Sequence, residues 1–159
     1  ATVGAVQLAA NAVTGASVAD GSLTNADLAD GPRAAFADGG QTLNVAAGTT
    51  VTVRSVTLTA PAAGKIVVNA SFEFKAGVAN AIELGRCSIS TGASLDGNHL
   101  HRLGEEGGTG VTTTLASSFS ATRGFNVAAG PFTVNIVCDA LFGPIEIRDS
   151  SLTAMYFPG

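Results

Sequence analysis

The first thirty residues carry one apolar side chain at every fifth position, and this spacing restricts how the segment can fold. The apolar positions are Val3, Leu8, Val13, Val18, Leu23 and Leu28. A five-residue period matches neither the period of about 3.6 residues of a helix nor the two-residue alternation of a strand. It suits a chain that turns a corner after each short straight run and sends one side chain toward a shared axis, as in solenoid repeats.

This tract also repeats in tens, because NAVTGASVAD is followed by GSLTNADLAD. Residues 1–30 form too few coils to bury a continuous core by themselves, since solenoid repeats are stable only when neighbours stack on them. We expect the axis residues to find their partners in the same tract of neighbouring copies. The sequence therefore predicts a protein that assembles with itself.

The composition excludes several classes of partner. The chain has 159 residues, of which 46% are hydrophobic and 13% charged, which is apolar for a soluble monomer and favours contact with other subunits. The net charge is −4 and the only lysines are Lys65 and Lys75, so there is no basic patch for nucleic acid or an anionic membrane. No run reaches the roughly 18 apolar residues that would insert into a bilayer.

The two cysteines, Cys87 and Cys138, each lie in a strand-like run. If they pair, they close a loop of about 50 residues, for which chain entropy predicts about 4 kcal/mol of stabilisation. The alternative is two separate buried thiols. We favour the disulfide and, with it, an oxidising compartment: a secreted, extracellular or cell-surface location. The sequence begins with Ala1, from which we expect a cleaved leader or removal of Met before a small residue.

The five-residue period ends after Leu28, because the next axis position holds Arg33. Residues 31–40, GPRAAFADGG, contain the Pro and Gly of a joint and are predicted to be a linker. From Gln41 onward the apolar residues follow the alternation of strands. The predicted organisation is an assembly tract over 1–30, a linker over 31–40 and a β-domain over 41–159.

The β-domain shows several runs in which apolar residues share one face. Val51 and Val53 differ in parity from Val56 and Leu58, which predicts a bulge or bend near residues 54–55. The other one-sided sets are Ile66, Val68, Ala70, Phe72 and Phe74; Cys87 and Ile89; Phe132, Val134, Ile136 and Cys138; Ile145 and Ile147; and Leu152, Ala154 and Tyr156. About eight strands with Gly or Pro turns, and no sustained helical period, predict an all-β antiparallel jelly-roll-like β-sandwich.

Two parts of the chain resemble known proteins. The tract VTGASVADGSLTNADLADG is similar to repeats that follow the signal peptide in many secreted actinobacterial proteins. The order PAAGKIVVNASFEF, RCSIS, TVNIVCD and SLTAMYFPG is similar to the C-terminal sandwich domain of those proteins. The general shape is similar to the C1q and tumour-necrosis-factor jelly rolls, which commonly form trimers. The resemblance implies secretion and self-assembly, and it brings no catalytic residue.

One cluster of residues could carry chemistry, the segment NHLHRLGEE at 98–106. His99 and His101 would share a face of a strand, and Glu105 could add an oxygen ligand, as in the first motif of the cupin metal sites. The flanking glycines are displaced, and the further histidine of a cupin site is absent because the chain has only two. The alternative is a polar loop or edge strand, so we expect no metal and no cofactor.

The remaining serines and threonines do not form a catalytic set, because a hydrolase triad would have to use the same two histidines. We therefore expect no enzyme but an extracellular structural subunit that self-assembles into a trimer or filament. The alternative is an adhesion or glycan-binding module that recognises a surface glycan or host receptor, or a phage fibre or spike protein. Glycan binding is disfavoured because the chain has no Trp and only one Tyr, Tyr156.

Overall fold

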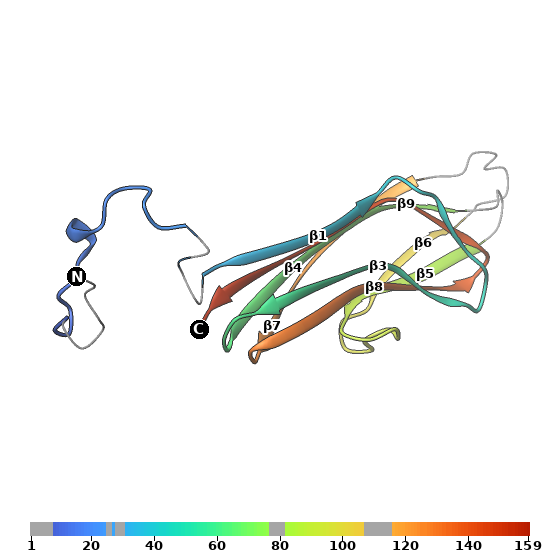
Figure 1. Cartoon of the computed structure of the whole chain (residues 1–159). Coiled ribbons are helices and arrows are strands. Elements are labelled where there is room, and N and C mark those ends of the chain that lie inside the picture. The colour runs from blue at the N-terminus through green and yellow to red at the C-terminus, as the bar shows by residue number, and fades with distance from the viewer. Residues whose placement is uncertain (1–7, 25–26, 28–30, 77–81, 107–115) are drawn as a thin grey trace. The chain divides into compact units, whose positions relative to one another are not determined.

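The computed structural model describes residues 8–24, 27, 31–76, 82–106 and 116–159. The chain divides into two units, Ala1–Gly31 and Pro32–Gly159, and each unit is described by itself. The second unit consists of antiparallel strands (Figure 1). In its described residues the strands are β1 (Arg33–Gly39), β2 (Leu43–Val45), β3 (Thr50–Ala60), β4 (Gly64–Ala76), β5 (Ile82–Ser90), β6 (His101–Glu106), β7 (Ala116–Val127), β8 (Gly130–Phe142) and β9 (Ile145–Pro158).

The strands form two sheets that pack face to face. Sheet A has the order β1-β9-β4-β7, with β2 also paired to β9, and sheet B has the order β3-β8-β5-β6. The chain crosses from one sheet to the other at β2 to β3, at β3 to β4, at β4 to β5, at β6 to β7, at β7 to β8 and at β8 to β9. All these strand pairs are antiparallel. The protein is therefore an antiparallel jelly-roll β-sandwich, which confirms the predicted fold class.

Strand β1 corrects the prediction of a linker over residues 31–40. Its residues pair with β9 in unbroken register from Arg33 opposite Tyr156 to Gly39 opposite Ser150. The Pro and Gly residues of 31–40 predict a linker, and the small residues at the inward positions of β1 give no strand pattern. Pro32 does not prevent a strand here, because β1 lies at the edge of sheet A, where a missing N–H group costs little.

The core lies between the sheets and is built from the alternating residues of the sequence. All five inward residues of β4, Ile66 to Phe74 in steps of two, are buried. The rings of Phe72 and Phe119 stack with centroids 4.3 Å apart and join β4 to β7 within the core. The predicted bulge in β3 is present, because the register with β8 shifts between Thr52 and Arg54. This shift brings Val53 and Val56, which differ in parity, into the same core.

A second bulge lies in β9. The register between β4 and β9 shifts after Ser71, so that Asp149 and Ser150 together oppose Phe72. Asp149 has a φ of 46°, in the left-handed region that a bulged residue can adopt. The bulge explains why the apolar alternation of Ile145 and Ile147 changes parity before Leu152 in the sequence.

The first unit contains a series of regular turns. Between the turns lie Leu8, Val13, Val18 and Leu23, each directly before the first residue of a turn. The turns are closed by backbone hydrogen bonds from Ala12 N to Ala9 O (3.0 Å), Ser17 N to Thr14 O (2.8 Å), Ser22 N to Ala19 O (3.0 Å) and Asp27 N to Thr24 O (3.0 Å). The chain thus turns a corner every five residues, as the sequence spacing predicts.

Side chains reinforce two of these turns. Thr14 and Ser17, at the 3₁₀ turn η2 (Gly15–Ser17), share a hydroxyl contact of 3.2 Å. The Asp27 carboxylate accepts bonds of 2.8 Å from both the backbone N–H and the hydroxyl of Thr24. These bonds, the backbone one first, lower the pKa of Asp27 below its ordinary value. No helix in the described part of the chain has the length and apolar character that a membrane crossing requires.

Candidate functional site

The outer surface of sheet A has rows of residues that lie opposite one another on four strands. These residues point away from the core, because their neighbours along each strand are buried or half-buried toward it. We call three of these rows the A face. They are Ala34, Met155, Val67 and Gly124; Phe36, Thr153, Asn69 and Thr122; and Asp38, Ser151, Ser71 and Ser120.

Two of the three rows of the A face contain no charged residue. Phe36 is 73% exposed, although a phenylalanine on a strand normally packs into a core. Phe157 follows on β9 beyond the first row and is 46% exposed. The Thr122 hydroxyl donates a hydrogen bond of 2.7 Å to the side-chain oxygen of Asn69. The first two rows of the A face are therefore uncharged and the third carries one charge, at Asp38, and so low a charge is typical of a contact surface.

A group of charged residues lies on the same sheet beyond the serine row. The Glu146 carboxylate pairs with Lys75 at 3.6 Å and with Arg148 at 2.6 Å. Glu73 lies opposite Arg148 across β4 and β9. The two signs are therefore balanced within this group of charges. At the other end of the sheet, Lys65 lies opposite Phe157.

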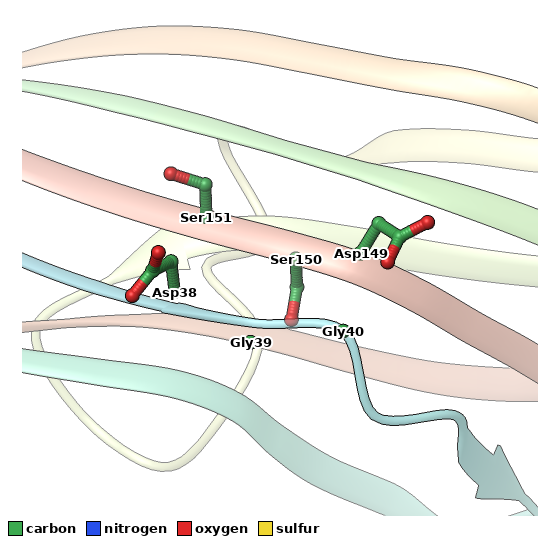
Figure 2. Close-up of a pocket in the computed structure, with 6 residues that line it drawn as sticks. All are labelled: Asp38, Gly39, Gly40, Asp149, Ser150 and Ser151. Carbon is green, nitrogen blue, oxygen red and sulfur yellow. The ribbon is translucent and has the colours of Figure 1, made fainter.

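A hollow of about 230 Å³ lies where β1 leaves β9, beside the bulge. Figure 2 shows that the carboxyl groups of Asp38 and Asp149 lie at opposite ends of this hollow and do not converge on one point. Arg54 approaches the hollow from β3 and donates hydrogen bonds to the backbone oxygens of Gly39 (2.9 Å) and Ser150 (3.4 Å). A guanidinium beside diverging carboxylates does not form a cation site.

The two histidines line one small cavity at the open side of the sandwich, between β6 and β7. The cavity has a volume of about 40 Å³ and is lined by Ile89, His99, His101, Ala121, Thr122 and Arg123. This volume is enough for a few water molecules. The ring of His101 meets Phe119 edge-on, with centroids 5.2 Å apart, so its surroundings are partly aromatic.

The three candidate metal ligands lie in β6 or just before it. His101 begins β6, whereas His99 lies before the strand, so the two do not share a strand face as expected. Glu105 lies four residues beyond His101 on β6, which separates their backbones by about 13 Å. Within the described ranges, no three His, Cys, Asp or Glu residues are grouped to hold a metal ion. The side chain of Glu105 lies outside the described residues, so the cupin-like arrangement stays a hypothesis.

An ion pair that the sequence reasoning missed closes the same side of the sandwich. Arg123 on β7 donates to Asp96 at 2.6 Å, in the loop of residues 91–100 between β5 and β6. Asp96 also accepts a bond from Asn98 N at 3.0 Å and lies 3.4 Å from His99. The pKa of Asp96 is lowered below its ordinary value, mainly by the hydrogen bond from Asn98 N and next by the bond from Arg123. The available signal was Arg123 itself, a charge at an inward position of an otherwise apolar strand face.

The two cysteines form the predicted disulfide. Cys87 and Cys138 lie directly opposite each other on β5 and β8, with 4.1 Å between their Cα atoms. Both are fully buried. One residue away, Arg86 lies opposite Asp139 and donates two hydrogen bonds to its carboxylate. These bonds raise the pKa of Arg86, and with the disulfide they tie the two central strands of sheet B.

The predicted assembly residues of the tract are exposed where they are described. Leu8, Val13 and Leu23 are 49%, 56% and 55% exposed, and Val18 is half-buried. Val3 and Leu28 lie outside the described residues. The described part of the chain therefore leaves the apolar row of the tract largely uncovered, as expected of residues that need a partner.

Comparisons with known proteins bear on the fold. No protein-family model matches the chain, and no curated protein matches it. Among solved structures, a chain of the T13 IBDV viral particle has 16% identity and a TM-score of 0.50, covering 78% of this chain and 31% of its own length. A chain of the infectious bursal disease virus VP2 subviral particle has 13% identity and a TM-score of 0.45, covering 82% of this chain and 34% of its own.

Eiger TNF from S. frugiperda is a further match, with 10% identity and a TM-score of 0.45, covering 78% of this chain and 91% of its own. The present chain spans about a third of the length of the viral chains that it resembles. The likeness to the T13 IBDV chain agrees with the jelly-roll order of the strands. At 16% identity this likeness shows a shared fold alone.

Proposed function

We propose that this protein is a non-enzymatic extracellular structural subunit that self-assembles, as a closed trimer or a filament, through the A face and the N-terminal tract. The observation that carries the proposal is the A face, where the exposed Phe36 lies in a row without charge and is followed by the apolar row of Ala34, Met155 and Val67. Within the described residues, no three His, Cys, Asp or Glu side chains are grouped to hold a metal ion.

The physical argument is the free energy of covering this surface. Burying a side chain such as Phe36 or Phe157 contributes about 1.5–3 kcal/mol each relative to leaving it in water. The first two rows of the A face carry no charge, so another subunit can approach Phe36 there without desolvating a charged group, whereas Lys65 lies opposite Phe157. Protein interfaces are likewise depleted in charge at their centres and enriched in Phe and Met. A second copy of this chain offers the same two uncharged rows, so self-association covers them on both partners.

Two further observations support the proposal. The T13 IBDV chain that shares this fold belongs to a viral particle. The buried disulfide between Cys87 and Cys138 favours an oxidising compartment and therefore a secreted or surface location. The resemblance of the tract to repeats of secreted actinobacterial proteins points the same way.

The test is a charge placed in the A face with a matched control elsewhere. Phe36→Asp introduces a carboxylate at the centre of the proposed contact. Phe142→Asp changes an equally exposed phenylalanine, 60% exposed, at the end of β8, outside the A face. Both side chains are exposed, so both variants should fold, which circular dichroism checks.

Analytical ultracentrifugation and negative-stain microscopy measure the outcome. We expect the wild type and Phe142→Asp to assemble alike, and Phe36→Asp to dissociate at a concentration at least tenfold higher, because 1.4 kcal/mol corresponds to a factor of ten. Equal assembly of all three proteins would exclude the A face as the interface. A wild type that stays monomeric at high concentration would overturn the proposed function.

A further inference from the structure

We infer that strand β7 forms a separate contact between copies, in which the side of β7 that faces away from β4 pairs antiparallel with the same side of β7 in another copy. We call this side of the strand the β7 edge. The inference rests on the proposed function, because it needs a chain that self-assembles. It deepens that function by naming a contact that is made by backbone hydrogen bonds and not by the A face.

The β7 edge is a long row of backbone groups. Strand β7 ends the path of sheet A, with β4 as its neighbour, and its twelve residues pair without interruption from Ala116 opposite Lys75 to Val127 opposite Gly64. Every second residue of such a strand directs its N–H and C=O groups away from the sheet. Among the described residues, no backbone hydrogen bond joins β7 to a strand other than β4. An extended chain that adds to this edge would satisfy these groups.

The other edge strands carry features that oppose the addition of a strand. Strands β1 and β2 have only seven and three residues, and β1 follows Pro32 and contains Asp38. Strand β3 has a bulge, and Arg54 beside this bulge donates to the backbone oxygen of Gly39 in β1 and so closes that side of the sandwich. Strand β6 has only six residues, and its sequence HRLGEE is rich in charge.

Strand β7 has none of these features on its outer face. It contains no Pro and no bulge, and its outward residues are small, uncharged and exposed: Ala116, Ser118, Ser120, Thr122, Gly124 and Asn126. Its one charged residue, Arg123, points inward, and an inward charge can protect an edge. Here the guanidinium pairs with Asp96 and donates to the backbone oxygen of Ile89, which neutralises the charge and holds it against sheet B.

The β7 edge is complementary to itself. A two-fold axis perpendicular to the sheet makes the two strands antiparallel and keeps the inward residues of both copies on the same side. The middle of β7 lies between Ala121 and Thr122, so full overlap places one of these two residues opposite itself. Arg123 then lies opposite Phe119 or Ala121 of the other copy and not opposite another Arg123. No like charges of β7 face each other, which favours a second copy as the partner.

The contact also continues the A face. Ser120, Thr122 and Gly124 of β7 end the three rows of this face. Two copies that pair through the β7 edge hold their A faces side by side and pointing the same way, so the A face of each copy stays available to further copies. An isologous contact alone stops at a dimer, whereas a subunit with a further, different contact can extend the assembly.

The test uses the full chain in the Phe36→Asp background, where the A-face contact is weakened. We expect this protein to form a dimer in sedimentation velocity. Adding Thr122→Lys places a charge at the middle of the β7 edge in both copies and should raise the dissociation constant of the dimer at least tenfold. The matched control adds Thr153→Lys, which places the same charge in the same row but on β9, and should leave the dimer unchanged. Circular dichroism checks that each variant folds.

A crosslink identifies the strands that meet. Cys87 and Cys138 are joined, so Thr122→Cys in the Phe36→Asp background adds the only free thiol. A short bis-maleimide should link position 122 of one copy to position 122 of the other, because this residue lies at or next to the two-fold axis. Thr153→Cys, in the same background, should give no such link. Amide hydrogen exchange at alternate residues of β7 should become slower as the protein concentration rises.

The outcomes separate the inference from the proposed function. If the wild type assembles but Phe36→Asp is monomeric at every concentration, the inference is overturned and the proposed function stands. The same conclusion follows if the two lysine variants weaken the dimer equally, or if position 122 does not link in the dimer. A β7 edge that pairs with an extended segment of another protein, and not with itself, would also overturn the inference. A wild type that stays monomeric would contradict both.

Discussion

Arg123 on β7 pairs with Asp96, in the loop between β5 and β6, at 2.6 Å, and so connects the two sheets at the open side of the sandwich. The same arginine donates to the backbone oxygen of Ile89 at the end of β5. Asp96 donates its own N–H to the hydroxyl of Ser88 at 3.0 Å. The loop of residues 91–100 is thus held against sheet B and strand β7 by charged and backbone bonds rather than by apolar packing.

The Asp96–Arg123 pair should make the free energy of unfolding of the β-sandwich depend on pH in the acidic range. The pKa of Asp96 is lowered from 3.8, first by the Asn98 N–H and then by Arg123, so the folded protein binds the proton more weakly than the unfolded chain. Its stabilisation is present above about pH 4 and is lost as pH falls further. We expect Asp96→Asn to lower the urea midpoint at pH 7 but hardly at pH 3.

The matched control is Asp38→Asn, which changes an exposed carboxylate of the hollow on β1. Its urea midpoint should equal that of the wild type at both pH values. A midpoint for Asp96→Asn that differs from the wild type equally at pH 7 and pH 3 would show that the carboxylate charge is not what holds the loop.

The disulfide should stabilise the β-sandwich through the unfolded state. Cys87 and Cys138 are separated by 51 positions, for which loop entropy gives about 4 kcal/mol. We expect the double substitution of both cysteines to Ala to lower the free energy of unfolding by about this amount in urea titrations, and reduction of the wild type to do the same. A loss below about 1 kcal/mol would mean that the loop is already restricted in the unfolded chain.

One buried and one exposed phenylalanine should distinguish residues that stabilise the fold from residues that stabilise the assembly. Phe74 is fully buried, so Phe74→Ala leaves a cavity and should cost about 3–5 kcal/mol of unfolding free energy. Phe36 is 73% exposed, so Phe36→Ala should leave the melting temperature of the monomer nearly unchanged while weakening assembly. Thermal unfolding at low concentration, paired with sedimentation at high concentration, measures both effects. A large stability loss for Phe36→Ala would place this ring in the fold instead.

Two glycines of sheet A should respond differently to Ala. A Cβ on Gly64 would lie 2.5 Å from the backbone oxygen of Phe157, which the register with β9 holds in place. Gly64→Ala should therefore destabilise the protein by about 1–3 kcal/mol. Gly124 has no atom within 4 Å of such a Cβ, so Gly124→Ala should be neutral or slightly stabilising. Equal urea midpoints for the two variants would contradict the close approach at Gly64.

The alternating strands could be recognised from sequence because their residues carry the pattern individually. The five residues from Ile66 to Phe74 in steps of two alternate with Val67 and three polar residues, and all five are buried. Strand β1 escaped recognition because Ala35 and Ala37 occupy its inward positions, and alanine carries too little apolar area to mark a face. The change of parity predicted the bulge in β3 near residues 54–55, and the structure places the register shift between Thr52 and Arg54.

The side-chain clusters were less accessible to sequence reasoning. His99 and His101 do line one cavity, but Arg123, from a strand about twenty residues later, determines its chemistry together with Asp96. The spacing of two residues between the histidines carries no information about a partner from another strand. Residues 107–115 follow Glu105 and Glu106 and lie outside the described residues, as do the side chains of these two glutamates.

The amino-acid sequence by itself determined the class of fold, the disulfide and the five-residue turns of the tract. Each of these depends on a local period or on a rare residue type, and such signals are short-range. Only the tertiary structure decided which residues lie side by side on the A face, because a row such as Phe36, Thr153, Asn69 and Thr122 joins four strands from distant parts of the chain. Strand order and register arise from packing between sheets, and no single stretch of sequence contains them.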